Sequence, residues 1–421
     1  MLLPNKIYVL GFDCGFFWEK NSCKHKLKLS PKQEEILNQA DIIATFPRIA
    51  EFFFNLDLGK KYQAERFLFC DIEESIYRLK AIANVGIKIV VLADGDPLFF
   101  GIGQTMLKKM DPNLLEIIPA QSSLQLACAR LKIPAHTVHC LSFHGQENYL
   151  KLAQALMQKK TICLLGDNKN TPEVLASFCQ ERGAKNFIFH VLTKLGTEDE
   201  QIFHIDLEND CCKPINTTPA LCIVQPKKNL AAPVKQEQKN KYFSYQSNLT
   251  VRATSLALLD LPRRSCFWDI GAGSGAVSFQ ALQEAPNTHI IAIEKNLERV
   301  NQILSLRQDL KAFALDIVAG EAPKCLNDLP TPDAIFIGGG LSGESGELIL
   351  DHAAKSLAKG GRIVVSCVLG KTFKLAEEFF KKESWYVEIM QIQISTSKPL
   401  GSDRYFVAKN PVFLIMAEKQ C

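Results

Sequence analysis

The sequence has 421 residues, of which 47% are hydrophobic and 22% are charged. A chain of this length is longer than a domain with one hydrophobic core ordinarily is, which predicts two or three folding units. No apolar run approaches the roughly 20 residues that a transmembrane helix needs. The first residues lack the basic start and long apolar segment of a signal peptide. The composition therefore indicates a cytoplasmic, globular protein with no membrane partner.

The formal net charge of +4 comes from a single segment. Five lysines and one glutamate lie between Pro226 and Lys241, so the rest of the chain is neutral overall. Nucleic-acid binding needs a basic patch on a folded surface, and we therefore expect no nucleic-acid partner. The segment is rich in Lys, Gln, Ala and Pro, which predicts a linker over 226–241 between domains over 1–225 and 242–421.

The fourteen cysteines do not form a metal-binding pattern. Most of them lie inside apolar stretches such as LQLACARL and IVVSCVL, where a thiol behaves as a small hydrophobic group. His136 and His139 have no cysteine or carboxylate at ligand spacing beside them. We expect free thiols in a reducing compartment and no bound metal.

The N-terminal half alternates apolar runs with longer amphipathic segments, which predicts an α/β fold. The expected strands cover 7–11, 41–45, 88–94, 115–120, 161–166 and 186–192. The expected helices cover 34–40, 73–85, 101–110, 124–131 and 172–183.

The C-terminal half alternates more regularly, and this predicts a parallel, doubly wound sheet with right-handed crossovers. The expected strands cover 265–270, 289–294, 314–320, 333–339, 362–369, 386–395 and 411–419. The expected helices cover 276–285, 297–308, 347–358 and 372–383. The last two strands have no helix between them, so we expect them to pair as an antiparallel hairpin at one end of the sheet.

The glycine loop DIGAGSG, from Asp269 to Gly275, follows a predicted strand and opens a predicted helix. Its spacing is tighter than the G-x-G-x-x-G of dinucleotide sites and suits S-adenosylmethionine, whose ammonium group Asp269 would meet. An ordinary tight turn is the alternative interpretation. Further candidates follow the next three strands: Glu294 for the ribose hydroxyls, Ala322 near the adenine edge, and Gly338 and Gly339 toward the substrate.

A second motif, ADGDPLFFGIG, follows the predicted strand 88–94. Pro97 excludes helix there, and Gly95 permits a strained turn that exposes backbone groups to a ligand. The alternative is a plain turn in which an aspartate caps the helix that begins near Gly101. Ser122 or Ser123 is a natural N-cap for the following helix. His144 could equally be a histidine whose hydrogen bonds are satisfied at a strand end. We identify no catalytic residue from the sequence.

Taken in order, these motifs resemble a known family over nearly the whole chain. LADGDPLFFGIG, PAQSSLQLACARLKIP, LSFHGQ, TPEVLASFC and LTKLGTEDEQI are similar to the cobalamin-pathway branch of the tetrapyrrole methylases. VRATSLALLDL, FWDIGAGSGAVSFQAL, IAIEKNLERV and DAIFIGGGL are similar to the decarboxylating corrin methyltransferases. The resemblance implies a two-lobed tetrapyrrole methylase domain followed by a Rossmann-like class I S-adenosylmethionine methyltransferase domain.

The resemblance also implies a reaction and its partners. Two methyl groups would pass from S-adenosylmethionine to positions 5 and 15 of precorrin-6B, a small corrin precursor, and the acetate at position 12 would lose carbon dioxide, giving precorrin-8X. Each domain would bind one S-adenosylmethionine, and a homo-oligomer is expected. Arg252 is a candidate for binding substrate carboxylates. The implied cofactor contacts are Asp94, Gly95, Asp96, Ser122, Ser123 and Leu165 in the first domain, and Gly271, Gly273, Gly275, Glu294 and Ala322 in the second.

The chain departs from the family pattern in two places. The glycine-rich loop expected after the first strand is here Gly11-Phe12-Asp13-Cys14-Gly15, with Asp13 or Phe12 where a second glycine is expected. The Thr-Lys and Glu expected before Val251 are here Ser247-Asn248 and Thr250. The alternative function is therefore another S-adenosylmethionine methyltransferase in which only the C-terminal domain is active and the N-terminal domain is a scaffold.

Overall fold

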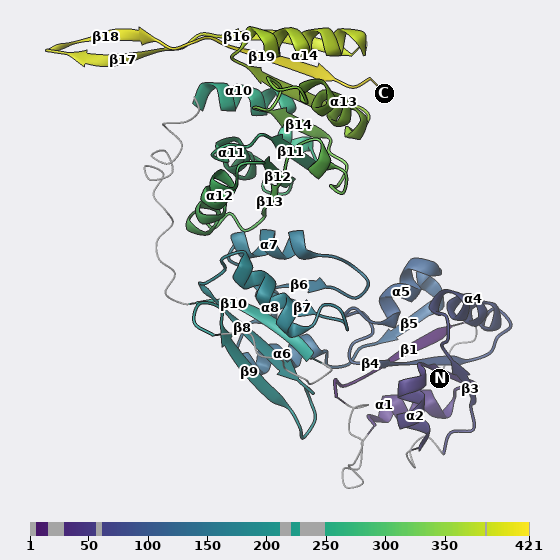
Figure 1. Ribbon diagram of the computed structural model, residues 1–421. Coiled ribbons are helices and arrows are strands. Elements are labelled where there is room, and N and C mark those ends of the chain that lie inside the picture. Colours follow the sequence, from purple (N-terminus) through teal and green to yellow (C-terminus); the bar gives the residue numbers. More distant parts are fainter. Residues whose placement is uncertain are drawn as a thin grey trace. The chain divides into compact units, whose positions relative to one another are not determined.

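The computed structural model describes residues 6–15, 29–55, 61–210, 220–227, 249–383 and 385–420 (Figure 1). Most of the expected linker over 226–241, and Ser247 and Asn248, lie outside these ranges. The chain forms two compact units. The first comprises Met1–Asn148, Lys160–Phe178 and Asn186–Lys227, and the second comprises Tyr149–Lys159, Cys179–Lys185 and Lys228–Cys421. Within the described ranges, no helix combines the length and the hydropathy needed to cross a membrane.

The first sheet of unit 1 is entirely parallel, in the order β3-β2-β4-β1-β5. Its strands are β1 (Ile7–Phe12), β2 (Ile42–Thr45), β3 (Glu65–Leu68), β4 (Ile89–Asp94) and β5 (Leu115–Ile118). Its residues alternate between two cores because successive side chains of a strand point to opposite faces. Tyr8 and Leu10 pack with α1 (Pro31–Asn38) and α2 (Pro47–Asn55), whereas Ile7 and Val9 pack with α4 (Ile72–Ala83) and α5 (Ile102–Lys109).

The second sheet of unit 1 is mixed, in the order β6-β7-β10-β8-β9. Only β6 (Val138–Ser142) and β7 (Thr161–Leu165) are parallel to each other; β10 (Ala220–Pro226), β8 (Phe187–Thr193) and β9 (Gln201–Asp206) add antiparallel pairs. Helix α6 (Ser123–Leu131) packs Leu126 and Ala127 against this sheet. Unit 1 is therefore two-lobed, with one sheet in each lobe.

Unit 2 contains a seven-stranded sheet in the order β13-β12-β11-β14-β15-β19-β16. The first five strands are parallel, and β19 and β16 are antiparallel. The strands are β11 (Cys266–Ile270), β12 (His289–Glu294), β13 (Leu315–Ala319), β14 (Ala334–Ile337), β15 (Arg362–Cys367), β16 (Tyr386–Ile392) and β19 (Val412–Glu418). The predicted parallel, doubly wound sheet is confirmed.

Helices cover both faces of this sheet. α13 (Gly346–Ser356) and α14 (Gly370–Lys382) bury one face, where Trp268 of β11 is 1% exposed. α10 (Leu249–Leu259), α11 (Ala276–Glu284) and α12 (Leu297–Asp309) contact the sheet strands β15, β12 and β13. The carboxyl ends of the parallel strands thus open at one edge of a three-layer α/β/α unit, where ligands of this architecture bind.

The C-terminal strands pair as expected, with one difference. β16 and β19 are antiparallel neighbours at one end of the sheet, but they are not joined by a simple hairpin. The intervening chain forms a separate two-stranded ribbon, β17 (Ser395–Leu400) and β18 (Asp403–Ala408), which runs outward from the sheet in Figure 1. The sequence analysis did not predict this ribbon, because the exposed strand STSKPL has neither apolar alternation nor a buried face.

Several short elements of unit 1 were also missed: α2, β3, β6, β9 and β10. β3 and β9 are edge strands whose side chains are mostly exposed, so their sequences lack a buried apolar pattern. β10 has the buried sequence LCIV, which an apolar-run search could have found.

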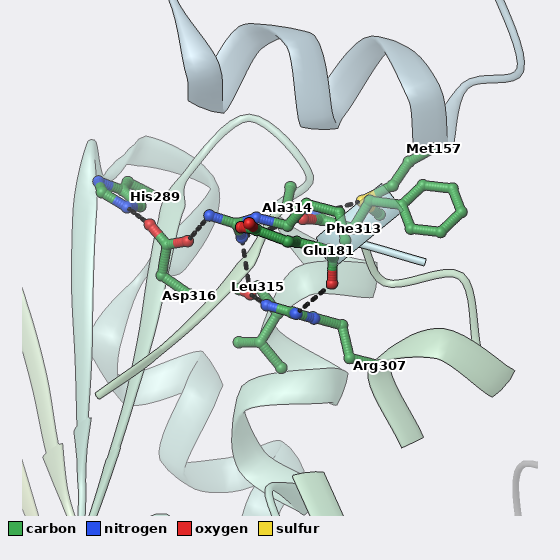
Figure 2. A network of polar contacts seen from close by, with 9 residues as sticks. Met157, Glu181, His289, Arg307, Phe313, Ala314, Leu315 and Asp316 are labelled. Atoms are coloured by element: carbon green, nitrogen blue, oxygen red, sulfur yellow. Dashed lines mark hydrogen bonds and ion pairs between the residues drawn. The ribbon is translucent and has the colours of Figure 1, made fainter. Parts of the chain in front are cut away.

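A polar network inside unit 2 joins its short segments to the edge strand β13. Figure 2 shows Met157, Glu181, Arg307, His289 and Asp316 as sticks, with His289 and Asp316 at the left of the network. Arg182 pairs with Asp316 at 2.5 Å and donates to the carbonyls of Phe313 and Leu315 at 3.2 and 3.1 Å, and His289 contacts the same aspartate at 2.6 Å. Arg307 donates to the carbonyl of Glu181 at 3.0 Å, and the amide of Ala314 meets Met157 Sδ at 3.4 Å.

The polar network favours the charged form of the Asp316 carboxylate. Burial opposes the charge, but the hydrogen bond from His289 and the guanidinium of Arg182 lower the pKa of Asp316. Burial lowers the pKa of Arg307 to about 10, with a smaller contribution from the positive charge of Arg182. The segments Tyr149–Lys159 and Cys179–Lys185 are thus held by directional contacts as well as by packing.

Two histidines form a cross-strand pair in the second sheet of unit 1. His190 on β8 lies opposite His204 on β9, with 2.6 Å between their Nδ1 atoms. His190 is 6% exposed, and burial, with the charge of His204, lowers its pKa to about 4. The folded unit therefore holds His190 in its neutral form at neutral pH.

We expect Arg182→Ala to destabilise unit 2 by about 2 kcal/mol, because two carbonyls lose a donor and Asp316 keeps only His289 as a partner. Urea unfolding followed by the fluorescence of the buried Trp268 measures this change. Lys185→Ala is the matched control, since Lys185 is exposed on the same segment. Equal midpoints for the two variants would show that the network contributes nothing to stability.

We expect unit 1 to lose stability as the pH falls from 6.5, the ordinary pKa, to about 4, the folded pKa of His190. In this range the unfolded chain binds a proton that the folded unit excludes, so stability rises with pH and levels off above the range. Urea unfolding followed by far-ultraviolet circular dichroism over these pH values measures the slope. His190→Gln should flatten this slope. His136→Gln, on an exposed turn, should leave the slope unchanged. Equal slopes in the two variants would refute the assignment of the slope to His190.

Candidate functional sites

A cavity of about 610 Å³ lies at the carboxyl ends of the parallel strands in unit 2. Asp269, at the end of β11, is 1% exposed and lines this cavity. Ser278 donates to its Oδ2 atom twice, from the backbone N at 3.1 Å and from Oγ at 2.5 Å. Its Oδ1 atom is buried without a partner among the described residues. Burial raises the pKa of Asp269 to about 7, against the opposing effect of the Ser278 hydrogen bonds.

The glycine loop brings backbone to the cavity wall. Gly271 has φ +75°, and a Cβ there would lie 3.1 Å from the backbone N of Gly339. A side chain would therefore be strained in conformation and would meet the neighbouring strand end. Helix α11 begins at Ala276 directly after the loop. Of the N–H groups in its first turn, which have no partner within the helix, that of Ser278 donates to Asp269.

Glu294 supports the glycine loop from the end of β12. It is 5% exposed, and its Oε2 and Oε1 atoms accept hydrogen bonds from the backbone N of Gly273 and Asn296 at 2.8 and 2.9 Å. Each carboxylate oxygen can accept a further hydrogen bond, so ribose hydroxyls remain compatible with this geometry. Asn296 in turn caps α12.

The structure separates the expected C-terminal site residues into two groups. Those on the cavity wall are Arg252, Asp269, Gly271, Gly273 and Gly338. Those that do not line it are Gly275, Glu294, Ala322 and Gly339. The sequence analysis did not name several further wall residues: Asn296, Arg299, Gln302, Phe336 and Ser366.

Arg252 is held beside the cavity by its neighbours. It is 6% exposed, its Nε atom donates to Gln280 Oε1 at 3.0 Å, and burial lowers its pKa. A guanidinium in this position can bind a carboxylate of a ligand through planar, charge-assisted hydrogen bonds.

A second cavity, of about 620 Å³, lies in unit 1. All six residues expected to contact a cofactor in this domain line it: Asp94, Gly95, Asp96, Ser122, Ser123 and Leu165. They come from the end of β4, the start of α6 and the end of β7. The sequence analysis did not name other wall residues: Cys14, Phe99, Asp167, Asn170, Leu195 and Ala220.

The turn after β4 has a conformation that places the backbone of Gly95 on the cavity wall. Gly95 has φ +72° and its N–H donates to Phe12 O at 2.7 Å. Asp96 Oδ1 accepts from the backbone N of Leu98 at 2.8 Å, which closes a local turn. Helix α5 has Gly101 at its N-cap without a side-chain cap. The alternative in which an aspartate caps this helix is therefore wrong.

Ser122 is confirmed as the N-cap of α6. Its Oγ accepts from the backbone N of Gln125 at 3.2 Å, and its own N–H donates to Gln125 Oε1 at 2.9 Å, which forms a capping box. The cap fixes where α6 begins, and hence where Ser122 and Ser123 meet the cavity.

The unusual loop at the end of β1, from Gly11 to Gly15, forms hydrogen bonds to Gln121, just before α6. Asp13 Oδ1 accepts from the backbone N of Gln121 at 2.9 Å, and the N–H of Cys14 donates to Gln121 O at 3.0 Å. Asp13, which stands where a glycine was expected, thus joins two walls of the cavity. Gly11 permits the close approach of β4, since a Cβ there would lie 2.8 Å from Gly95 O.

The C-terminal cavity fits S-adenosylmethionine. A buried carboxylate oxygen without a partner suits the ammonium group, and Glu294 lies behind the loop where ribose hydroxyls are expected. The glycine loop leaves room that a Cβ would fill. The N-terminal cavity offers exposed backbone at Gly95 and a mixed polar and apolar wall, which also suits this molecule.

Comparisons with known proteins match both halves of the chain. A family described as precorrin methyltransferase domain matches residues 243–419, and the tetrapyrrole (corrin/porphyrin) methylases match residues 27–209. The cobalt-precorrin-6B C(15)-methyltransferase (decarboxylating) of Salmonella typhi is 34% identical over 40% of this chain and 87% of its own. A crystal structure of precorrin-6y C5,15-methyltransferase from Geobacter metallireducens GS-15 shares 36% identity over 41% of this chain and 90% of that one, with a TM-score of 0.39.

One relative spans both units of the chain. The precorrin-6Y C(5,15)-methyltransferase (decarboxylating) of Sinorhizobium sp is 31% identical over 353 residues, which are 81% of this chain and 81% of the relative. The chain therefore belongs to the family of the decarboxylating precorrin-6Y C(5,15)-methyltransferases.

Proposed function

We propose that this protein transfers methyl groups from S-adenosylmethionine to positions 5 and 15 of precorrin-6B and removes carbon dioxide from the acetate at position 12, giving precorrin-8X in cobalamin biosynthesis in the cytoplasm. The domain over 1–225 serves position 5, and the domain over 242–421 serves position 15 and the decarboxylation. The observation that carries the proposal is the presence of two cavities of similar size, one in each unit, each beside its own cofactor motif.

S-adenosylmethionine supplies a methyl group already activated on a sulfonium, so the protein's task is alignment and charge placement. In the C-terminal site, Asp269 holds the ammonium group, and Glu294, with the loop it supports, holds the ribose. Arg252 binds a carboxylate of the corrin precursor at the cavity wall. The electron pair released by decarboxylation passes into the conjugated ring.

The alternative, in which only the C-terminal domain is active, has less support. The N-terminal cavity is lined by every residue of its expected cofactor motif, and Asp13 accepts a hydrogen bond from the backbone N of Gln121, next to the wall residue Ser122. The family match also covers the N-terminal half. One cofactor in each unit is therefore part of the proposal.

Mass spectrometry of the product formed from precorrin-6B and S-adenosylmethionine tests the function. We expect two methyl gains and the loss of carbon dioxide. Leu165→Trp, which fills the N-terminal cavity, should remove one methyl gain and keep the loss, whereas Asp269→Ala should remove the other methyl gain together with the loss. One methyl gain with the loss of carbon dioxide would show that the C-terminal domain alone is active. An unchanged ring would refute the proposed function and favour another class of S-adenosylmethionine methyltransferase.

Cofactor binding at the C-terminal site should depend on pH. Below about 7 the empty site holds Asp269 protonated, so a cationic ligand must displace that proton. Affinity should therefore rise up to tenfold per pH unit toward about pH 7 and then level off. Calorimetry with S-adenosylhomocysteine over this range should find two sites per chain, of which one is pH-dependent.

Asp269→Asn should remove that dependence and weaken the same site. Asp351→Asn is the matched control, because Asp351 lies on α13 outside the cavity and pairs with Lys355. A pH-independent affinity at both sites of the unaltered protein would contradict the assignment of Asp269.

A further inference from the structure

His144 lies on the wall of the N-terminal cavity, directly after β6. Its backbone N donates to Ser142 Oγ at 3.3 Å, and its Nδ1 atom lies 3.4 Å from the same hydroxyl. The adjoining residues are fixed: Phe143 is fully buried and its N–H donates to Leu165 O at 2.8 Å, and the N–H of Gly145 donates to Asp167 Oδ2 at 3.4 Å. The imidazole is thus an exposed side chain on a fixed backbone.

The ring has one nitrogen left for a ligand. Nδ1 faces Ser142, whose Oγ can accept from it while also accepting from the backbone N of His144. In this tautomer Nε2 carries a lone pair, and no partner for it is found among the residues that the structure describes. Among the described residues, the protein thus provides a partner for only one ring nitrogen of His144.

The other titratable groups on this wall are occupied or unsuited to accepting a proton. Asp94 pairs with Arg48 at 3.1 Å, and Asp96 accepts from the backbone N of Leu98. Hydrogen bonds, first from the backbone of Asn170, lower the pKa of Asp167 to about 2, which makes this carboxylate a weak base. Burial raises the pKa of Cys14 to about 12, so it stays a thiol.

The proposed reaction needs a proton acceptor at this site. Methylation of a ring carbon that carries hydrogen replaces that hydrogen, so one proton must leave for each methyl group added. Histidine is the side chain whose ordinary proton affinity suits such a transfer at neutral pH. In the described part of the chain, His144 is the one histidine on the cavity wall.

We propose that His144 is a catalytic residue of the N-terminal site and accepts the proton that the ring carbon loses when it is methylated. This inference rests on the proposed function. The ring carbon uses an electron pair of the conjugated system to form its bond to the methyl carbon, and the carbon–sulfur bond breaks with its pair going to the sulfonium sulfur. The C–H bond then breaks: its electron pair restores the conjugated ring and its proton moves to Nε2. Ser142 orients the imidazole through Nδ1.

The test uses the full chain with His144→Ala and His144→Gln, and His139→Ala as the matched control. His139 is an exposed histidine on β6 that does not line the cavity. Single-turnover methylation at position 5 should fall about 100-fold or more in both His144 variants and be unchanged in the control. Calorimetry should still find two S-adenosylhomocysteine sites per chain in all three proteins.

Two further measurements separate proton transfer from a structural role. Added imidazole should restore part of the activity of His144→Ala and none to an inactive protein that has lost its fold. The rate of the unaltered protein should rise with pH, and the variants should lack this rise. The other titratable groups on the cavity wall, which the variants retain, are Cys14, Asp94, Asp96, Asp167 and Cys222.

Three results would overturn the inference. The first is an unchanged rate of methylation at position 5 in the His144 variants. The second is the loss of a cofactor site in these variants, which would make His144 a cofactor contact. The third is a slow rate in His144→Ala that added imidazole does not restore. Failure of the proposed function is distinguishable, because then the unaltered protein itself would add no methyl group at position 5 of precorrin-6B.

Discussion

The C-terminal site depends on a carboxylate buried at the end of a parallel strand. Removing the charge of Asp269 from water is unfavourable unless hydrogen bonds and an opposite charge compensate. Ser278 supplies two hydrogen bonds to one oxygen and leaves the other without a partner. The site is therefore incomplete in electrostatic terms, and a cationic ligand completes it. The fold holds the aspartate in this state because buried residues of helix α11 and of the neighbouring strands surround it.

The N-terminal site also combines an aspartate at a strand end, a glycine turn and the start of a helix, but arranges them differently. Here Asp94 ends its strand beside Arg48, and the ligand-facing groups are the backbone of the turn at Gly95 and the capped start of α6. The two cavities are similar in volume, but the N-terminal one draws its wall from both sheets of unit 1. A loop after β6 can therefore bring a proton acceptor to a cofactor motif that follows β4.

Much of the fold could be predicted because hydrophobic periodicity is a local property. Most strands and helices of unit 2 were recognised from their apolar runs, since a doubly wound sheet buries its strands on both faces. Helix α10 (Leu249–Leu259) was not predicted. Elements with an exposed face were missed, as in β3, β9 and the ribbon of β17 and β18. The role of Asp96 was open in the sequence, because a turn and a helix cap use the same residue types; the position of Gly101 at the N-cap decided it.

The sequence by itself identified the family and predicted a cofactor motif in each half of the chain, since glycine spacing and the residues at strand ends are readable without coordinates. Only the tertiary structure decided which residues share a cavity. Gly275 stands in the same motif as Gly273, and Glu294 ends the next strand, but neither lines the cavity. By contrast, His144 and Asp94 lie on one cavity wall although 50 residues separate them in the chain. The physical reason is that strand order and sheet twist, which depend on the packing of the whole unit, set the convergence of loops at a sheet edge.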